Sequence, residues 1–251
     1  MIELTSNMVL LAFLVFCRVG GCLMFMPGFS SARIPAQARL FVAIAVSLAL
    51  TPILLPTITN DIGTLDASNS LFLLVSEVAI GAAIGLMGRM FFLALSFIAV
   101  AMASFIGLAN LPGIPLESAE PNPTLSALLT LAATVLFFVA DLHWEVLRGL
   151  VESYAVMPVS AGYDGQFALT QLTEVLSKAF MIALQISSPL IVFSISINFL
   201  FGIMNKFTPQ IAVYFVSLPF VIFGGMVLLY LTVGEILTIF IKTFGSWLVT
   251  G

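Results

Sequence analysis

The chain has 251 residues, of which 61% are hydrophobic and only 8% are charged. A soluble globular domain is about 45–50% apolar and about 25% charged, so this composition excludes an ordinary soluble enzyme and a disordered protein. The net charge of -4 and the lack of a basic run exclude a nucleic-acid binder, and the two cysteines exclude a disulfide scaffold. We expect a polytopic membrane protein, or one that covers its apolar surface within a larger assembly.

Five apolar blocks follow one another along the chain, and a membrane helix needs about 20 such residues. The blocks cover approximately residues 8–26, 40–55, 71–108, 125–140 and 179–249, the last interrupted near 206–210. The third block is too long for one pass, and the fifth would need at least two. Helices are expected because lipid offers the backbone no hydrogen-bond partner. We expect residues 1–26 to be a retained first helix rather than a signal peptide, because no basic segment precedes the apolar run.

Prolines punctuate these blocks and predict breaks in the helices. Pro27 follows the first block, Pro52 and Pro56 close the second, and Pro189 interrupts the fifth. The fourth block would be a helix of about 24 Å, which is shorter than the hydrocarbon core of about 30 Å. Short, broken helices indicate hairpins that other protein shields, and clean lipid-facing spans are the alternative.

Charged and small residues inside the apolar blocks mark candidate contact sites. Arg18 lies in the first block, and Glu77, Gly81, Gly85 and Arg89 follow one another at steps of four that keep side chains on one helix face. These residues either pack and pair locally or form a subunit interface. For the glycines we favour helix packing. For Glu77 we favour a partner on another helix or subunit, because an unpaired carboxylate in lipid costs several kcal/mol.

A second series of polar and small residues lies in the fifth block. Asn198, Gly202 and Lys206 are also four residues apart, and Pro209 and Gln210 follow them. The series is consistent with a helix C-terminus, where Lys206 is favourable for the helix dipole. It is equally consistent with a polar turn that contacts a partner, and both interpretations stay open.

The residues predict no catalytic, cofactor or metal site. His143 is the only histidine, no zinc or dinucleotide motif is present, and no G-x-S-x-G motif provides a nucleophile. We interpret His143 as a packed or interfacial side chain, and Cys17 and Cys22 as packing residues. The sequence therefore predicts a membrane protein that is not an enzyme.

Polar, small and proline residues recur in one order along nearly the whole chain. The features are Arg18-Val19, Pro27, Ile34-Pro35, Arg39, Glu77, Ile80-Gly81, Gly85, Phe105-Ile106-Gly107-Leu108, His143-Trp144, Leu147, Leu150, Ser153-Tyr154, Met157-Pro158, Pro189, Asn198, Gly202, Asn205-Lys206, Pro209-Gln210, Phe215 and Pro219. This series resembles the family of FliR, the flagellar biosynthesis protein, and its virulence-secretion relative SctT. The chain departs from the family at Asp141-Leu142, where Asn-Gly is common, at Lys206, where Arg is common, and in the sequence of loop 109–124.

The resemblance implies an export-gate subunit of a type III secretion apparatus, and we favour the flagellar branch. It implies one complex with FliP and FliQ, contacts with FlhB and FlhA, and passage of unfolded flagellar proteins through a central pore. The expected location is the bacterial cytoplasmic (inner) membrane, in contact with membrane lipid, at the flagellar basal body. No nucleic acid and no cofactor are expected.

The resemblance also implies the fold. We expect an all-α protein of membrane-associated helical hairpins with broken helices. Residues 1–175 would form a FliP-like part and residues 176–251 a FliQ-like hairpin that turns at 206–210.

A plug loop that helps close the pore is a further implication of the resemblance, and it matches residues 108–123. The segment contains apolar residues that suit occlusion, together with prolines and a glycine that prevent a regular helix. An exposed connecting loop is the alternative. The expected plug residues are Leu108, Leu111, Pro112, Gly113, Ile114, Pro115 and Leu116.

The polar and small positions inside the apolar blocks are our candidates for subunit contacts. The expected interface residues are Arg18, Glu77, Gly81, Gly85, Arg89, Asn198, Gly202, Lys206, Pro209 and Gln210. An independent multi-pass channel or secondary transporter is the alternative function. It would require polar groups near the bilayer middle and often repeat symmetry, but the charges here are scattered and no repeat is found.

Overall fold

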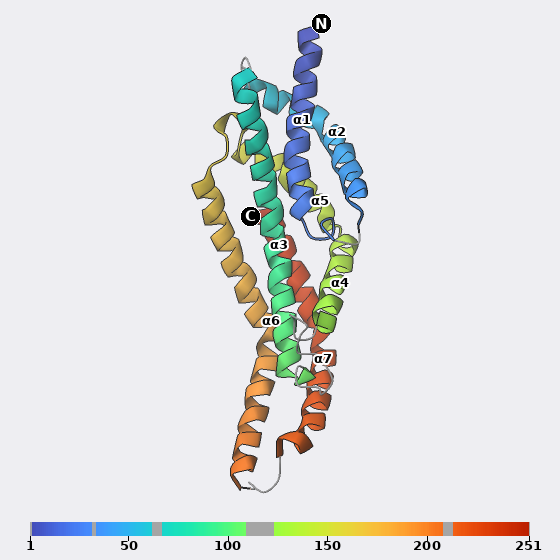
Figure 1. The fold of residues 1–251 in the computed structure, drawn as a ribbon, viewed down its shortest axis with the longest axis vertical. Coiled ribbons are helices and arrows are strands. Elements are labelled where there is room, and N and C mark those ends of the chain that lie inside the picture. Colours follow the sequence, from blue (N-terminus) through green and yellow to red (C-terminus); the bar gives the residue numbers. More distant parts are fainter. Residues whose placement is uncertain (1, 32–33, 62–66, 109–122, 208–212, 251) are drawn as a thin grey trace. The chain divides into compact units, whose positions relative to one another are not determined.

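The structure is a computed structural model that describes residues 2–31, 34–61, 67–108, 123–207 and 213–250. Every regular element in these residues is helical (Figure 1), which confirms the expected all-α fold. The elements are α1 (Ile2–Phe25), α2 (Ala36–Asp61), α3 (Ala67–Phe105), α4 (Pro123–Val139), α5 (Leu142–Val156), the 3₁₀ helix η2 (Val159–Ala161), α6 (Gly165–Phe207) and α7 (Val213–Thr250).

Five of these helices are long and apolar enough to cross a membrane. The candidate spans are Met8–Phe25, Ala36–Thr59, Leu71–Phe105, Gly165–Phe207 and Ser217–Val249. A sixth candidate is the pair Thr124–Val139 and Leu142–Val156, which is bent by 72°. These helices confirm the membrane protein that the composition predicts.

Three helices are much longer than an ordinary span. Helix α3 has 39 residues, α6 has 43 and α7 has 38. At about 1.5 Å per residue, each is roughly twice as long as the hydrocarbon core of about 30 Å. The third apolar block, which we expect to be too long for one pass, instead forms one uninterrupted helix that contains a single candidate span. Each of these helices is therefore longer than the hydrocarbon core is thick.

The expectation that prolines end or interrupt the helices is wrong at three positions. Pro52 and Pro56 lie inside α2, which continues to Asp61, and Pro189 lies inside α6. A proline removes one backbone donor, but leaving the helix in lipid would expose many unpaired backbone groups. Continuing the helix is therefore the less costly conformation.

The fourth apolar block forms a short helix, as the sequence predicts, and the chain turns sharply after that helix ends. Helix α4 has 17 residues, and α5 starts three residues after it ends, with Asp141 between them in the left-handed conformation at φ 55°. The Asp141 N–H donates to the carbonyl of Phe138, and the Asp141 carbonyl accepts from the Trp144 N–H. These hydrogen bonds hold a tight corner that redirects the chain into α5.

The described chain divides into two compact units. Unit 1 consists of Met1–Phe91, Phe137–Ser177 and Trp247–Gly251, and unit 2 of Phe92–Leu136 and Lys178–Ser246. Helices α3, α6 and α7 each contribute residues to both units. The predicted boundary between a FliP-like part (1–175) and a FliQ-like hairpin (176–251) falls inside α6, and it stays a prediction.

In unit 1, glycines let α1 and α3 pack backbone against backbone. A Cβ added to Gly81 would lie against the Arg18 carbonyl, and one added to Gly85 would lie against the Cys22 carbonyl. One turn further along, a Cβ on Gly88 would lie 2.7 Å from the Met26 sulfur. At these contacts the residue numbers increase in the same direction along both helices, so α1 and α3 run parallel. This packing agrees with the helix-contact interpretation of Gly81-x-x-x-Gly85.

In unit 2, aromatic side chains and one further glycine form the contacts. The Phe92 ring meets the rings of Phe240 and Phe244 edge-on, with centroids 5.3 and 5.7 Å away. A Cβ on Gly225 of α7 would lie 2.5 Å from the Ile106 side chain. Helices α6 and α7 run in opposite directions (Figure 1), so this part of the chain is a helical hairpin.

Adding a methyl group at Gly81 should loosen unit 1. We expect Gly81→Ala to destabilise the protein by about 1–3 kcal/mol, because its Cβ would push α1 away from α3. The matched control is Gly234→Ala, whose Cβ has no neighbour within 4 Å. There the better helix propensity of Ala should stabilise by up to about 1 kcal/mol.

The chain provides its own probe for this measurement. Cys17 and Cys22 are its two cysteines, and both are buried and unbridged in α1. Heating the detergent-solubilised protein with a fluorogenic maleimide therefore reports the opening of unit 1. A lower reaction midpoint for Gly81→Ala, with Gly234→Ala unchanged or higher, is the expected result. Equal midpoints for wild type and Gly81→Ala would contradict the close packing.

Candidate functional site: a buried arginine cluster beside a cavity

The most unusual group in unit 1 is the guanidinium of Arg18, which is fully buried in the middle of an apolar helix. The exposed fraction is 0% for Arg18 and 1% for the facing Glu77. Ionisable side chains are rarely found at such depth unless they pair with one another or with backbone carbonyls. Arg18 does both.

Arg18 of α1 and Glu77 of α3 form a bidentate ion pair. Arg18 Nε lies 2.6 Å from Glu77 Oε2, and Arg18 Nη2 lies 2.7 Å from Glu77 Oε1. Two parallel hydrogen bonds of this kind are short, charge-assisted and strongly directional. They therefore fix the rotation and the register of α1 relative to α3.

The remaining donors of Arg18 reach α5 and the residue that follows it. Nη1 donates to Ser153 Oγ over 3.1 Å, and Nη2 donates to the Met157 carbonyl over 2.9 Å. The Ser153 hydroxyl donates in turn to the Leu150 carbonyl, which leaves its oxygen free to accept. The guanidinium carbon also lies 3.8 Å from the centre of the Tyr154 ring, a cation–π contact.

The end of α5 explains why a carbonyl is available at Met157. The Met157 N–H still donates to Ser153, but the Met157 backbone leaves the helical conformation at φ -125° and ψ 80°. Its carbonyl is therefore outside the helical ladder and points to Arg18. One guanidinium thus joins α1, α3 and the end of α5.

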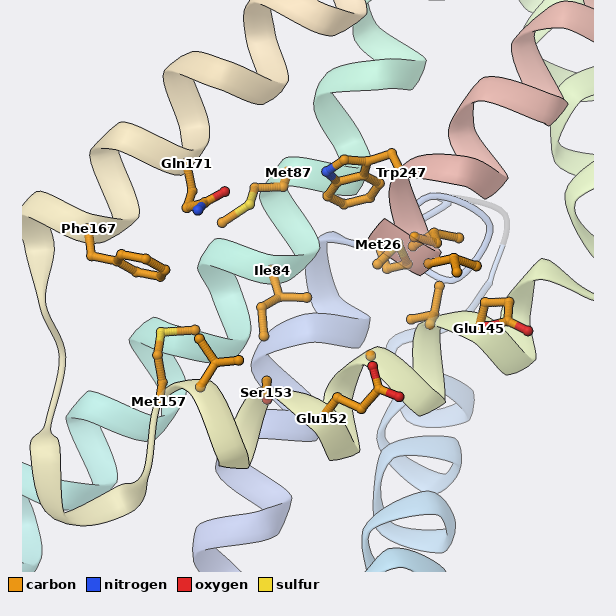
Figure 2. Close-up of a pocket in the computed structure, with 15 residues that line it drawn as sticks. Met26, Ile84, Met87, Glu145, Glu152, Ser153, Met157, Phe167, Gln171 and Trp247 are labelled. Atoms are coloured by element: carbon orange, nitrogen blue, oxygen red, sulfur yellow. The ribbon is translucent and has the colours of Figure 1, made fainter. Parts of the chain in front are cut away.

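A cavity of about 190 Å³ lies beside this cluster, entirely within unit 1. Ser153 and Met157 belong both to its wall and to the partners of Arg18. Figure 2 shows Glu145 and Glu152 on α5, and Trp247 on α7, around the same space. The Trp247 ring rests against the Phe91 ring at 5.1 Å. The wall is mostly apolar with carboxylates at its edge, which suits binding of an apolar group rather than covalent chemistry.

No metal site is found among the described residues, where no group of three His, Cys, Asp or Glu side chains comes together. His143 instead lies between the Phe138 and Trp144 rings, with centroid distances of 5.7 and 5.5 Å. This position agrees with the packed histidine that the sequence indicates.

The structure places the residues predicted for the subunit interface in several different settings. Arg18, Glu77, Gly81 and Gly85 are buried in contacts within this chain, while Arg89 is exposed. Glu77 therefore has its partner on another helix of the same chain, one of the two options that the sequence left open. The contact of these residues with another subunit stays a prediction.

The second predicted series lies on an exposed helix surface. Asn198, Gly202 and Lys206 are exposed on the last part of α6, and the Asn198 amide donates to the Ser194 carbonyl at 2.8 Å. Lys206 lies in the last turn of α6, as the helix-end interpretation predicts. Pro209 and Gln210 fall outside the described residues.

Of the predicted plug residues, only Leu108 is described, just after α3 ends at Phe105. The other plug residues, Leu111, Pro112, Gly113, Ile114, Pro115 and Leu116, lie outside the described residues.

Sequence reasoning missed the α5 half of the cluster. Ser153, Tyr154 and Met157 belong to the series behind the family resemblance, but nothing there assigned them to Arg18. The only signal was Arg18 itself, because a buried guanidinium needs more acceptors than one carboxylate provides.

Replacing one partner of the ion pair should destabilise unit 1 far more than replacing both partners. We expect Arg18→Met to destabilise unit 1 by about 3–5 kcal/mol, because it leaves Glu77 buried without a partner. The double variant Arg18→Met, Glu77→Leu should be less destabilised than Arg18→Met alone.

The exposed pair Arg148–Glu152, with Nε and Oε1 3.1 Å apart, provides the control. Arg148→Met should cost below about 1 kcal/mol. The maleimide reaction midpoint ranks the variants. A double variant that melts below Arg18→Met would show that the pair is not the dominant contact.

Comparison with known proteins places the chain in one family over almost its whole length. The family model for "Bacterial export proteins, family 1" matches residues 9–247. The "Flagellar biosynthetic protein FliR" of Caulobacter vibrioides is 28% identical over 234 residues, which cover 92% of this chain and 92% of that protein. The protein of the same name from Aquifex aeolicus is 27% identical over 246 residues, covering 92% and 88%.

A further relative shows the same breadth. The "Flagellar biosynthetic protein FliR" of Escherichia coli K12 is 24% identical over 233 residues, which cover 91% of this chain and 88% of that protein. The family match includes every residue of the arginine cluster, from Arg18 to Met157, and the helices that hold them. The chain therefore belongs to the bacterial export proteins of family 1.

Proposed function

We propose that this protein is an export-gate subunit of the flagellar type III protein secretion apparatus in the bacterial inner membrane. The observation that carries the proposal is the near-complete correspondence with proteins named for flagellar biosynthesis, over about nine-tenths of both chains. The proposed role is structural: the chain helps to form and close the pore through which unfolded flagellar proteins leave the cell.

The proposed partners are FliP and FliQ, in one complex that FlhB and FlhA contact. An exposed apolar surface on the hairpin of unit 2 supports such an assembly. Phe199 and Phe207 of α6 and Phe223 and Tyr230 of α7 are each exposed by 70% or more. Because α6 far exceeds the bilayer thickness, partner subunits would have to cover apolar surface that lipid does not. Residues 176–251 would be the FliQ-like part and residues 1–175 the FliP-like part.

The proposed gate is the loop 108–123. Its ends are defined by Gly107, which has φ +80° after α3, and by Pro123, which starts α4. The left-handed conformation at Gly107 ends the helix and turns the chain away from it. Apolar Leu111, Ile114 and Leu116 would then occlude the passage.

Purification tests the assembly directly. A tagged copy of the chain, expressed from its native locus and solubilised in mild detergent, should co-purify with FliP-like and FliQ-like membrane proteins. Deleting the gene should abolish secretion of flagellar proteins into the medium. A stable chain that purifies alone and transports a small solute in vesicles would support an independent channel or transporter and contradict the proposal.

Shortening the loop tests the gate. Deleting residues 110–116 should raise ion conductance across membranes that contain the assembled complex, because apolar side chains are removed from the passage. Replacing Leu111, Ile114 and Leu116 by Ser should have the same effect at full loop length. The control deletes residues 62–66, another connection between helices. Unchanged conductance in an intact complex would refute the plug.

A further inference from the structure

The cavity beside the arginine cluster has a carboxylate at its edge that finds no cation in the described part of the chain. Glu145 is half-buried in the first turn of α5 and lines the cavity. The nearby cations have other partners, since Arg18 pairs with Glu77 and Arg148 with Glu152. An anionic group is therefore held at the edge of an apolar space.

The space itself suits an apolar chain. Met26, Met87, Phe167 and Trp247 line the cavity, which measures about 190 Å³. An engineered, fully apolar cavity of about 150 Å³ binds benzene, so this one is large enough for several methylene groups. A Cβ added to Gly149, in the same wall, meets no atom within 4 Å. The absence of a side chain at Gly149 keeps the cavity open.

Two tryptophans and the charge pattern of α5 favour a position of this cavity at the level of lipid headgroups. Trp144 and Trp247 are the two tryptophans of the chain. Trp144 is 63% exposed beside Glu145, and Trp247 lines the cavity. Tryptophan is enriched at the boundary between hydrocarbon and water. Helix α5 buries apolar residues on one face and carries exposed Arg148 on the other, as interfacial helices do.

We propose that the cavity binds a phospholipid with a primary ammonium headgroup, namely phosphatidylethanolamine. The ammonium pairs with Glu145, and part of an acyl chain occupies the apolar cavity. Glu145 repels an anionic phospholipid such as phosphatidylglycerol. This site does not depend on the proposed role in export.

Native mass spectrometry of the purified, detergent-solubilised protein tests the site, in whatever complex the protein forms. Dioleoyl phosphatidylethanolamine and dioleoyl phosphatidylglycerol are added at equal concentration. We expect retention of phosphatidylethanolamine about tenfold above phosphatidylglycerol, the ratio that one charge-assisted contact provides.

Two pairs of variants test separately how the cavity and the Glu145 carboxylate contribute to lipid retention. Gly149→Leu fills the cavity and should reduce phosphatidylethanolamine retention about tenfold, whereas Gly234→Leu, which also meets open space, should not. Glu145→Gln should bring the two lipids to about equal retention, and Glu174→Gln, an exposed position on α6, should not. The maleimide reaction midpoint confirms that each variant is folded. Glu145→Gln keeps the test informative if Gly149→Leu fails to fold.

Several outcomes would overturn the proposal. Equal retention of both lipids by the wild type, or full retention of phosphatidylethanolamine by Gly149→Leu, excludes this site. Displacement of the lipid by free phosphoethanolamine at equal concentration would show that the apolar cavity contributes nothing. A purified complex that takes up neither lipid would show that the cavity is not a phospholipid site.

Discussion

The buried guanidinium of Arg18 is the constraint on which unit 1 depends. A charge at this depth is tolerated only if it is paired and hydrogen-bonded, and four hydrogen bonds to Glu77, Ser153 and Met157 provide this. Because these acceptors come from α3 and from the end of α5, α1 can occupy one position only. The ion pair adds little net stability compared with apolar residues of similar volume in the same place. Any other arrangement of the helices, however, would leave a buried charge without a partner. We infer that the cluster specifies the arrangement rather than simply strengthening it.

Glycine packing and the ion pair act together at the α1–α3 contact. Gly81 faces the backbone of Arg18 itself, one turn beyond Glu77. If a larger residue separated the helices there, the two short hydrogen bonds to Glu77 would lengthen or break. The steps of four that connect Glu77, Gly81 and Gly85 therefore combine close approach with charge pairing on one face. The cavity continues from this cluster, since Ser153 and Met157 belong to both.

Much of this fold could be predicted from the sequence, because composition and apolar blocks depend on local chemistry. The helical class, the apolar spans and the short fourth helix follow from it, whereas the family is identified by its resemblance to the ordered series of polar, small and proline residues. The prolines misled the reasoning, since in lipid the cost of exposing backbone groups exceeds the loss of one hydrogen bond. The sequence pattern also does not identify which residue pairs with Glu77. Arg89 follows Glu77 in the same series of four-residue steps but is exposed, whereas the pairing of Glu77 with Arg18 spans 59 residues and the bond from Arg18 to Ser153 spans 135.

Exchanging the charges tests most directly whether this cluster specifies the fold that export requires. Arg18→Glu and Glu77→Arg are each introduced alone and then together, and secretion of flagellar proteins into the medium is measured at matched protein levels. Each single variant buries two like charges and should abolish secretion. The exchanged pair restores opposite charges and should recover part of it, although its guanidinium starts from α3 rather than α1. Normal secretion by either single variant, in a complex with its usual subunits, would contradict the account.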